Sequence, residues 1–224
     1  MNYEKSTSIV SRGKKHRKPT FIVLHCTGNP NVGAVTKYYT SGDAYPHYLI
    51  GHDGKVFSFC REDMRAAHAA WPSWEYQTYR KKSWKLHWQN PRTGKRKVMD
   101  DGLIYANWVL RWGDRFENPI ELVKASGGEN PNLSSIGIEL LAPKHRGTGF
   151  SADQYSSLIN LLIDISGRWN IPLPTKDGPS EYLCGHDDVS PIRRYAIGKG
   201  VAAGNGYDPG PLFAWSLLTT AAVG

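Results

Sequence analysis

The chain has few cysteines, and their spacing excludes one class of fold. Only three occur in 224 residues, at Cys26, Cys60 and Cys184. An odd number at wide spacing does not fit the paired cysteines of small disulfide-rich secreted domains. Cys26 and Cys184 lie in strand-like apolar segments, where a cysteine most often serves as a small buried hydrophobic residue. We therefore expect no disulfide framework.

Long apolar runs are absent as well. No segment approaches the roughly 20 apolar residues that span a bilayer, so we expect no stable membrane insertion. The first 19 residues are basic but lack the continuous apolar stretch of a secretory signal. We expect synthesis in the cytoplasm without a signal peptide.

Acidic residues are outnumbered by basic ones. The chain has 28 Lys and Arg against 20 Asp and Glu, a net charge of +8 and a pI near 9.3. Such a surface attracts polyanions, among them nucleic acid, anionic cell-wall polymers and acidic membrane surfaces. The net charge affects solubility and the attraction of charged partners, but it does not identify a reaction.

The length and the 40% hydrophobic content are enough for one sizeable core. We expect a basic N-terminal arm over residues 1–19 and one domain over 20–224. Residues 71–131 form an insertion rich in tryptophan, lysine and arginine, with a helix expected near 101–116. The insertion is either a peripheral aromatic core or an extension of a binding groove.

Strand-like and helical patterns alternate along the domain. The pattern indicates an α/β fold, a single domain with a central, mainly mixed β-sheet flanked by helices. Ser151 and Gln154 have the spacing of a helix capping box. The expected elements are strands at 20–26, 134–142 and 181–186, a hairpin at 47–60, and helices at 32–40, 151–169 and 211–218.

Three residues at the edges of expected elements form a candidate metal site. His25 ends the first strand, His186 ends the last, and Asp208 lies in the segment YDPGP. Taken singly, the histidines could be ordinary strand-end residues and Asp208 a turn former. Together, three nitrogen and oxygen ligands suit a catalytic zinc ion, because the fourth tetrahedral position stays open for water.

Glu139 lies in the middle of the apolar segment SSIGIELLA. A carboxylate in such a run is costly unless it is paired or faces a wet cleft. Beside a zinc site it can serve as a general base, which would accept a proton as water attacks a carbonyl. The residues thus indicate metal-assisted amide hydrolysis.

With these residues the chain resembles the zinc-dependent N-acetylmuramoyl-L-alanine amidases, a family that includes phage endolysins, muropeptide-recycling amidases and peptidoglycan recognition proteins. The resemblance implies Zn²⁺ held by His25, His186 and Asp208, with Glu139 as the acid or base. It also implies cleavage of the bond between N-acetylmuramic acid and L-alanine. The segments that carry it are FIVLHCT, HYLIGHDGKVF, RAAHAA, SIGIEL, QYSSLINLL, GHDDVSP and YDPGP.

The same resemblance implies that Tyr45, His47 and His68 bind substrate, although His47 could instead be a hydrogen-bonded strand histidine. The chain also departs from the family pattern. Many relatives have a lysine two positions before the third ligand, where this sequence has Gly206. Lys199 is the candidate cation to replace it and to stabilise the oxyanion. Arg193, Arg194 or zinc alone are alternatives.

The resemblance implies peptidoglycan or muropeptides as partners. We expect a monomer that acts on the cell wall or periplasm if it is lytic, with a holin or immunity protein as an associated factor. A phage enzyme that lyses Gram-negative cells fits the basic charge, and a delivered effector or a recycling enzyme are the alternatives. An inactive peptidoglycan-binding protein is a rival, as is a nucleic-acid-binding protein. The last explains the charge but not the ligand set, so we expect no nucleic acid partner.

Overall fold

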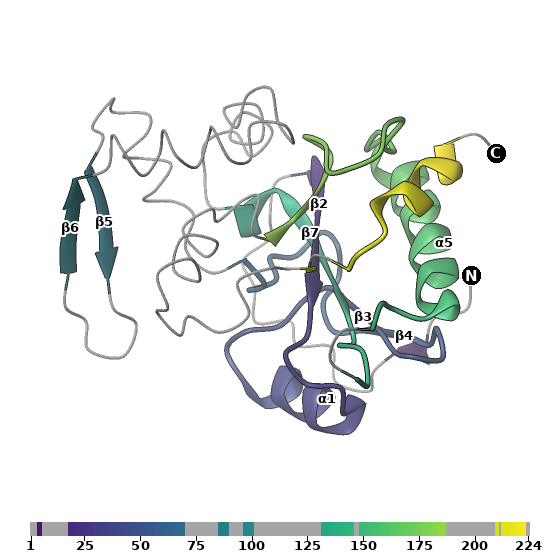
Figure 1. Ribbon diagram of the computed structural model, residues 1–224, viewed down its shortest axis with the longest axis horizontal. Coiled ribbons are helices and arrows are strands. Elements are labelled where there is room, and N and C mark those ends of the chain that lie inside the picture. The colour runs from purple at the N-terminus through teal and green to yellow at the C-terminus, as the bar shows by residue number, and fades with distance from the viewer. Residues whose placement is uncertain are drawn as a thin grey trace.

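A mixed β-sheet forms the centre of the computed structural model, which describes residues 4–5, 18–69, 85–89, 96–100, 131–145, 148–186, 209–210 and 212–222 (Figure 1). Its strand order is β1-β4-β3-β7-β2-β8. The strands are β1 (Glu4–Lys5), β2 (Phe21–Cys26), β3 (Tyr48–Ile50), β4 (Val56–Ser58), β7 (Ser135–Leu140) and β8 (Leu183–Gly185). In this sheet, parallel pairs join β1 to β4, β3 to β7, β7 to β2 and β2 to β8, and β3 and β4 pair antiparallel.

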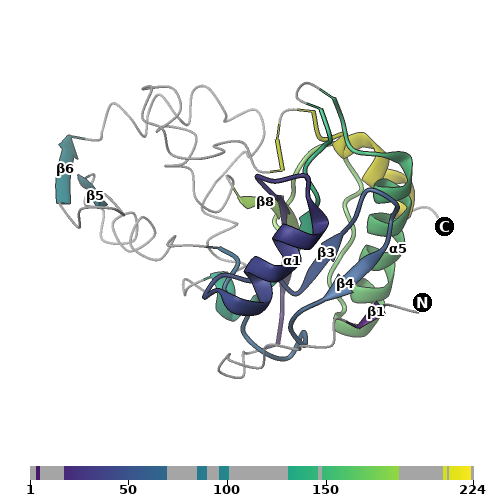
Figure 2. The ribbon, with the colours of Figure 1, turned by 90° about the horizontal axis from the view of Figure 1, so that it is seen from below.

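Helices α1 (Val32–Ser41) and α5 (Ala152–Trp169) flank the sheet, and Figure 2 shows them on opposite sides of β3. This arrangement confirms the expected α/β fold. It also confirms the 47–60 hairpin, which is β3 and β4. Further short elements are an antiparallel pair, β5 (Lys85–Gln89) and β6 (Arg96–Asp100), and the 3-10 helix η1 (Pro131–Leu133).

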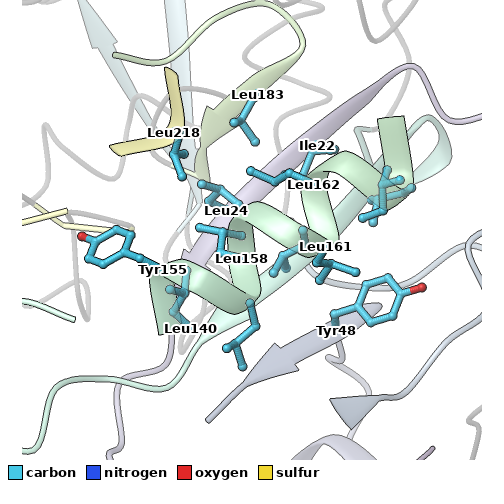
Figure 3. Packing of buried hydrophobic residues seen from close by; sticks show 14 of the residues in the cluster. Ile22, Leu24, Tyr48, Leu140, Tyr155, Leu158, Leu161, Leu162, Leu183 and Leu218 are labelled. Carbon is cyan, nitrogen blue, oxygen red and sulfur yellow. The ribbon is translucent and has the colours of Figure 1, made fainter. Parts of the chain in front are cut away.

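The face of the sheet that meets α5 carries the main hydrophobic core (Figure 3). Alternate residues of the central strands point to this face, among them Ile22, Leu24 and Leu140. Leu158 and Leu162 of α5 pack against them and are fully buried. Burial of each such side chain contributes about 1.5–3 kcal/mol, so this layer is the main stabilising contact of the fold.

Helix α5 has defined signals at both ends. Ser151 caps its start, and the Ser151 and Gln154 side chains form the expected capping box. Gln154 Nε2 also donates to the carbonyl of Leu141, at 2.9 Å, which ties the start of the helix to the end of β7. Asn170 ends the helix in the left-handed region at φ 57°. The helix predicted at 151–169 is thereby confirmed.

The opposite face of the sheet has a smaller apolar cluster and a polar region. Val35 and Tyr39 of α1 pack in this cluster with Leu49 of β3 and Phe59. Because residues of one strand alternate between faces, His25 points to this side of the sheet and not into the main core. The polar region lies beside the cluster, where β2, β7 and β8 end.

The closing helix predicted near 211–218 is present, with later bounds than expected. The structure has a 3-10 helix, η2 (Trp215–Ala222), which begins four residues later. The Tyr155 hydroxyl accepts a hydrogen bond from the Ala214 backbone N–H at 2.7 Å. The Phe213 ring packs against Tyr155 at a tilt of 45°, with ring centroids 5.4 Å apart. These contacts fix residues 213 and 214 before the helix begins.

All three cysteines are free thiols. Cys60 and Cys184 are buried and Cys26 is half-buried. Burial, with a smaller effect of the nearby Asp63 carboxylate, raises the pKa of the Cys60 thiol to about 12. No helix in the described part of the chain is both long and apolar enough to cross a membrane. The helix expected near 101–116 and most of the arm lie outside the described residues, and the domain boundaries stay predictions.

Candidate functional site

Three candidate residues stand where neighbouring parallel strands end. His25 is next to last in β2, Glu139 is next to last in β7, and His186 directly follows β8. The register pairs His25 with Glu139 and Leu24 with Gly185, so His186 comes beside His25. Paired residues of adjacent strands point to the same face. The carboxyl edge of a parallel sheet is where such folds place ligand sites.

The two histidines meet edge to face. The ring centroids of His25 and His186 lie 4.6 Å apart with 70° between the ring planes. Both residues are buried, at 1% and 4% exposure. Two imidazoles at this separation can offer two nitrogen ligands to the same metal ion. That is a partial ligand set for zinc.

His68 is the third histidine of the site. Its Nδ1 lies 3.0 Å from His25 Nε2, and its Nε2 lies 3.1 Å from the Ser135 hydroxyl oxygen. The planes of the His25 and His68 rings are nearly perpendicular, at 83°. Burial, and then the neighbouring His25, His47 and His186, hold the pKa of His68 well below its usual value. His68 is therefore neutral at pH 7, with one N–H and one lone pair.

Asn132 and Gly137 explain how His68 reaches this position. The Asn132 side chain accepts hydrogen bonds from the backbone N–H groups of His68 and Ala69, at 3.1 and 2.8 Å, and donates to the carbonyl of Ala69 at 2.7 Å. The His68 ring lies directly over Gly137 of β7. A Cβ atom at Gly137 would come within 2.3 Å of His68 Cγ. Only glycine leaves room for the ring.

His47 is fully buried, and both of its ring nitrogens are hydrogen-bonded within the fold. The Gly137 backbone N–H donates to His47 Nδ1 at 2.9 Å. His47 Nε2 therefore carries the proton and donates to the carbonyl of Met64 at 3.0 Å. The ring centroids of His47 and His68 lie 5.7 Å apart. His47 thus links β7 to the loop before His68.

Tyr45 is buried at 5% exposure and packs in the smaller cluster. Its hydroxyl donates to the carbonyl of Arg65 at 3.4 Å, and its backbone pairs with Ala67. The substrate-binding roles of Tyr45, His47 and His68 stay predictions.

Asp208, Lys199 and Gly206 lie outside the described residues, as do Arg193 and Arg194. Within the described ranges, no three side chains of His, Cys, Asp or Glu form a group that could hold a metal ion. The zinc site predicted from the sequence thus has two of its three ligands in the described part of the chain.

Sequence reasoning missed Ser135, Asn132 and Gly137. One signal was present, because a glycine inside a buried strand often marks a close approach of another group. Gly137 in SIGIEL is such a glycine, although the sequence does not say which group approaches.

A cavity of about 370 Å³ lies elsewhere, between residues 177–179 and 213–216. None of the candidate site residues lines it. It therefore has no part in the site at the carboxyl edge of the sheet.

Comparison with known proteins agrees with this architecture. A selenomethionine derivative of AmpD superposes with a TM-score of 0.50 at 16% identity, over 98% of this chain and 93% of that one. AmpDh3 from Pseudomonas aeruginosa superposes with a TM-score of 0.50 at 21% identity, over 100% of this chain and 66% of that one. At these identities the likeness concerns the fold alone. No curated protein matches the chain in sequence.

The sequence itself matches a family model. The model is described as N-acetylmuramoyl-L-alanine amidase and matches residues 15–211, which is most of the chain. The match includes every strand that ends at the site. The chain therefore belongs to the N-acetylmuramoyl-L-alanine amidase family.

Proposed function

We propose that the protein is a zinc-dependent amidase that hydrolyses the bond between N-acetylmuramic acid and L-alanine in peptidoglycan. The observation that carries the proposal is the meeting of His25, Glu139 and His186 on one face, where three parallel strands end. Family membership supports the reaction class.

The donor set fits zinc as far as the described residues reach. His25 and His186 supply two imidazole nitrogens in a buried setting. Asp208 is the third ligand in this proposal, on the basis of the sequence and the family resemblance. Zinc, when bound, polarises the carbonyl of the scissile amide and lowers the pKa of a water molecule.

Glu139 supplies the proton transfers. It is half-buried, and its Oε2 atom is buried. The carboxylate accepts a proton from the attacking water as the new C–O bond forms at the amide carbon. It then returns this proton to the departing nitrogen of L-alanine as the C–N bond breaks. Lys199 is the proposed cation that stabilises charge on the carbonyl oxygen.

A lytic role is the setting we propose, and the net charge of +8 supports it. Peptidoglycan and its associated polymers are anionic, so a basic enzyme is concentrated at the wall surface. Soluble muropeptide fragments offer far less of this attraction.

The role of Glu139 is tested with Glu139→Gln, which removes the proton acceptor and keeps the shape. Cleavage of a defined muropeptide, followed by chromatography, should fall at least about 100-fold. Asp153→Asn is the control, because Asp153 is exposed on α5, on the other side of the sheet. Wild-type cleavage by the folded Glu139→Gln variant would refute the assignment.

The metal is tested by elemental analysis of the purified protein. One zinc per chain is expected in the wild type, and a strong loss of zinc in His186→Ala. His145→Ala is a matched control, because His145 is exposed. An absence of zinc from active wild-type protein would rule out the proposed chemistry.

The proposed lytic role is tested by comparing cleavage of two substrates. A lytic enzyme should cleave intact sacculi faster than soluble muropeptides at equal amounts of cleavable bond. The reverse preference would indicate recycling, and binding of sacculi with no cleavage of either substrate would indicate a binding protein.

A further inference from the structure

We propose that His68 is a positioning residue, which with Ser135 fixes the tautomer of His25 so that His25 presents Nδ1 to the metal. The inference rests on the proposed function, because it takes His25 as a zinc ligand. It gives His68 a role different from the substrate binding that the family resemblance implies.

The first step is the contact between the two rings. His25 Nε2 and His68 Nδ1 are 3.0 Å apart and both rings are buried, so a proton lies between these nitrogens. Because His25 Nε2 is engaged in this contact, a ligand role for His25 falls to Nδ1.

The second step is the direction of the hydrogen bond. A neutral imidazole has one N–H and one lone pair, and a metal-binding nitrogen must keep its lone pair. The proton of His25 must then sit on Nε2 and be donated to His68 Nδ1. If His68 donated instead, the proton of His25 would sit on Nδ1 and block that nitrogen.

The third step is the anchor beyond His68. When His68 Nδ1 accepts, its own proton lies on Nε2, which is 3.1 Å from the Ser135 hydroxyl oxygen. That oxygen has lone pairs to accept it. The chain of hydrogen bonds from His25 to His68 to Ser135 is therefore complete in the direction that zinc binding needs.

The surroundings hold His68 in this place. Gly137 lets the ring lie flat against β7, and Asn132 fixes the backbone on either side of the His68–Ala69 bond. Ser135 comes from the same strand as Gly137 and, two positions away, points to the same face. Outer-shell partners of this kind orient metal-binding histidines and raise metal affinity.

The tautomer of His25 is the direct test. Nitrogen NMR of the imidazole rings, in protein freed of zinc, distinguishes a proton on Nε2 from one on Nδ1. In the wild type His25 should be the Nε2–H form, and in His68→Leu a mixture of both forms. A predominant Nδ1–H form of His25 in the wild type would overturn the proposal. Because zinc is absent, this result is independent of whether the protein cleaves peptidoglycan.

Zinc affinity is the second measurement, made by competition with a chelator. His68→Leu should bind zinc about 10- to 100-fold more weakly than the wild type. His68→Gln should recover part of the affinity, because its amide oxygen can accept from His25. Wild-type affinity in folded His68→Leu would refute the positioning role.

Two further variants separate positioning from simple loss of structure. Ser135→Ala keeps both rings and the backbone hydrogen bond of Ser135 to His68, and removes only the hydroxyl. It should keep the fold and weaken zinc binding, and it serves as the test if His68→Leu does not fold. His52→Ala is the matched control, since His52 Nε2 also bonds within the fold, to the carbonyl of Ala142 at 2.7 Å, but is not part of this chain. An equal loss of zinc affinity in His52→Ala and Ser135→Ala would contradict the proposal.

Discussion

At the residue scale, the close packing of Gly137 against His68 makes a sharp prediction. Gly137→Ala would place a Cβ atom 2.3 Å from His68 Cγ, so the ring or the central strand must move. Overpacking of this kind costs about 1–3 kcal/mol in free energy of unfolding. Denaturant unfolding should show this loss.

The control for this measurement is Gly167→Ala in α5. A Cβ at Gly167 meets nothing within 4 Å, and alanine favours a helix over glycine by about 0.5–1 kcal/mol. Gly167→Ala should therefore stabilise the fold. A stability for Gly137→Ala equal to that of the wild type would mean that His68 does not lie where we describe it.

Some residues of the site could be predicted from the sequence, and others could not. His25 and His186 were found because each ends an expected strand, and Glu139 because a lone carboxylate in an apolar run needs a partner or a wet cleft. Parallel strands then bring the three residues to one edge of the sheet. The Ser135–His68 contact was not found. It joins residues 67 positions apart, and it depends on the path that the chain takes over β7.

At the scale of elements, a half-buried carboxylate joins the end of α5 to β3. Glu62 accepts hydrogen bonds from Arg168 at 2.7 and 3.0 Å, from Trp169 at 2.6 Å and from Tyr48 at 2.8 Å. Burial alone would raise the pKa of Glu62, but these hydrogen bonds outweigh it and lower the pKa below its usual value of 4.5. The ionised form is therefore the one that stabilises the fold.

The sign of the pH dependence follows from this lowered pKa. The stabilisation should be fully present above about pH 4.5 and be lost as the pH falls toward the folded-state pKa. At neutral pH, Glu62→Gln should cost roughly 1.5–3 kcal/mol, the range for hydrogen bonds to a charged group. Unfolding measured from pH 7 to pH 3 should show the two proteins converging on the acid side.

Asp63→Asn is the control for Glu62→Gln. Asp63 pairs with Arg61 at the surface, where the Arg61 side chain is 66% exposed, so this change should cost under about 1 kcal/mol. A difference between wild type and Glu62→Gln that does not change with pH would show that the charge of Glu62 does not contribute.

Most elements of the fold could be predicted from the sequence, whereas the start of the closing helix could not. Helix α5 has its capping signals within its own sequence, and β2 and β7 are continuous apolar runs. The start of η2 depends instead on Tyr155 and Ala214, which are 59 positions apart. The local sequence pattern does not reveal a contact between residues so far apart in the sequence.

At the scale of the whole molecule, zinc binding should be coupled to global stability. His25 lies in β2 and His186 directly follows the adjacent strand β8, so a metal held by both adds a link between these strands that the unfolded chain lacks. The free energy of unfolding should then rise with the logarithm of free zinc concentration, by about 1.4 kcal/mol for each tenfold increase above the dissociation constant. Unfolding by urea in zinc buffers measures this slope, and His186→Ala should have a slope near zero. A zinc-independent wild-type stability would mean that zinc does not bind the folded state preferentially, because a ligand that favours the native state must stabilise it.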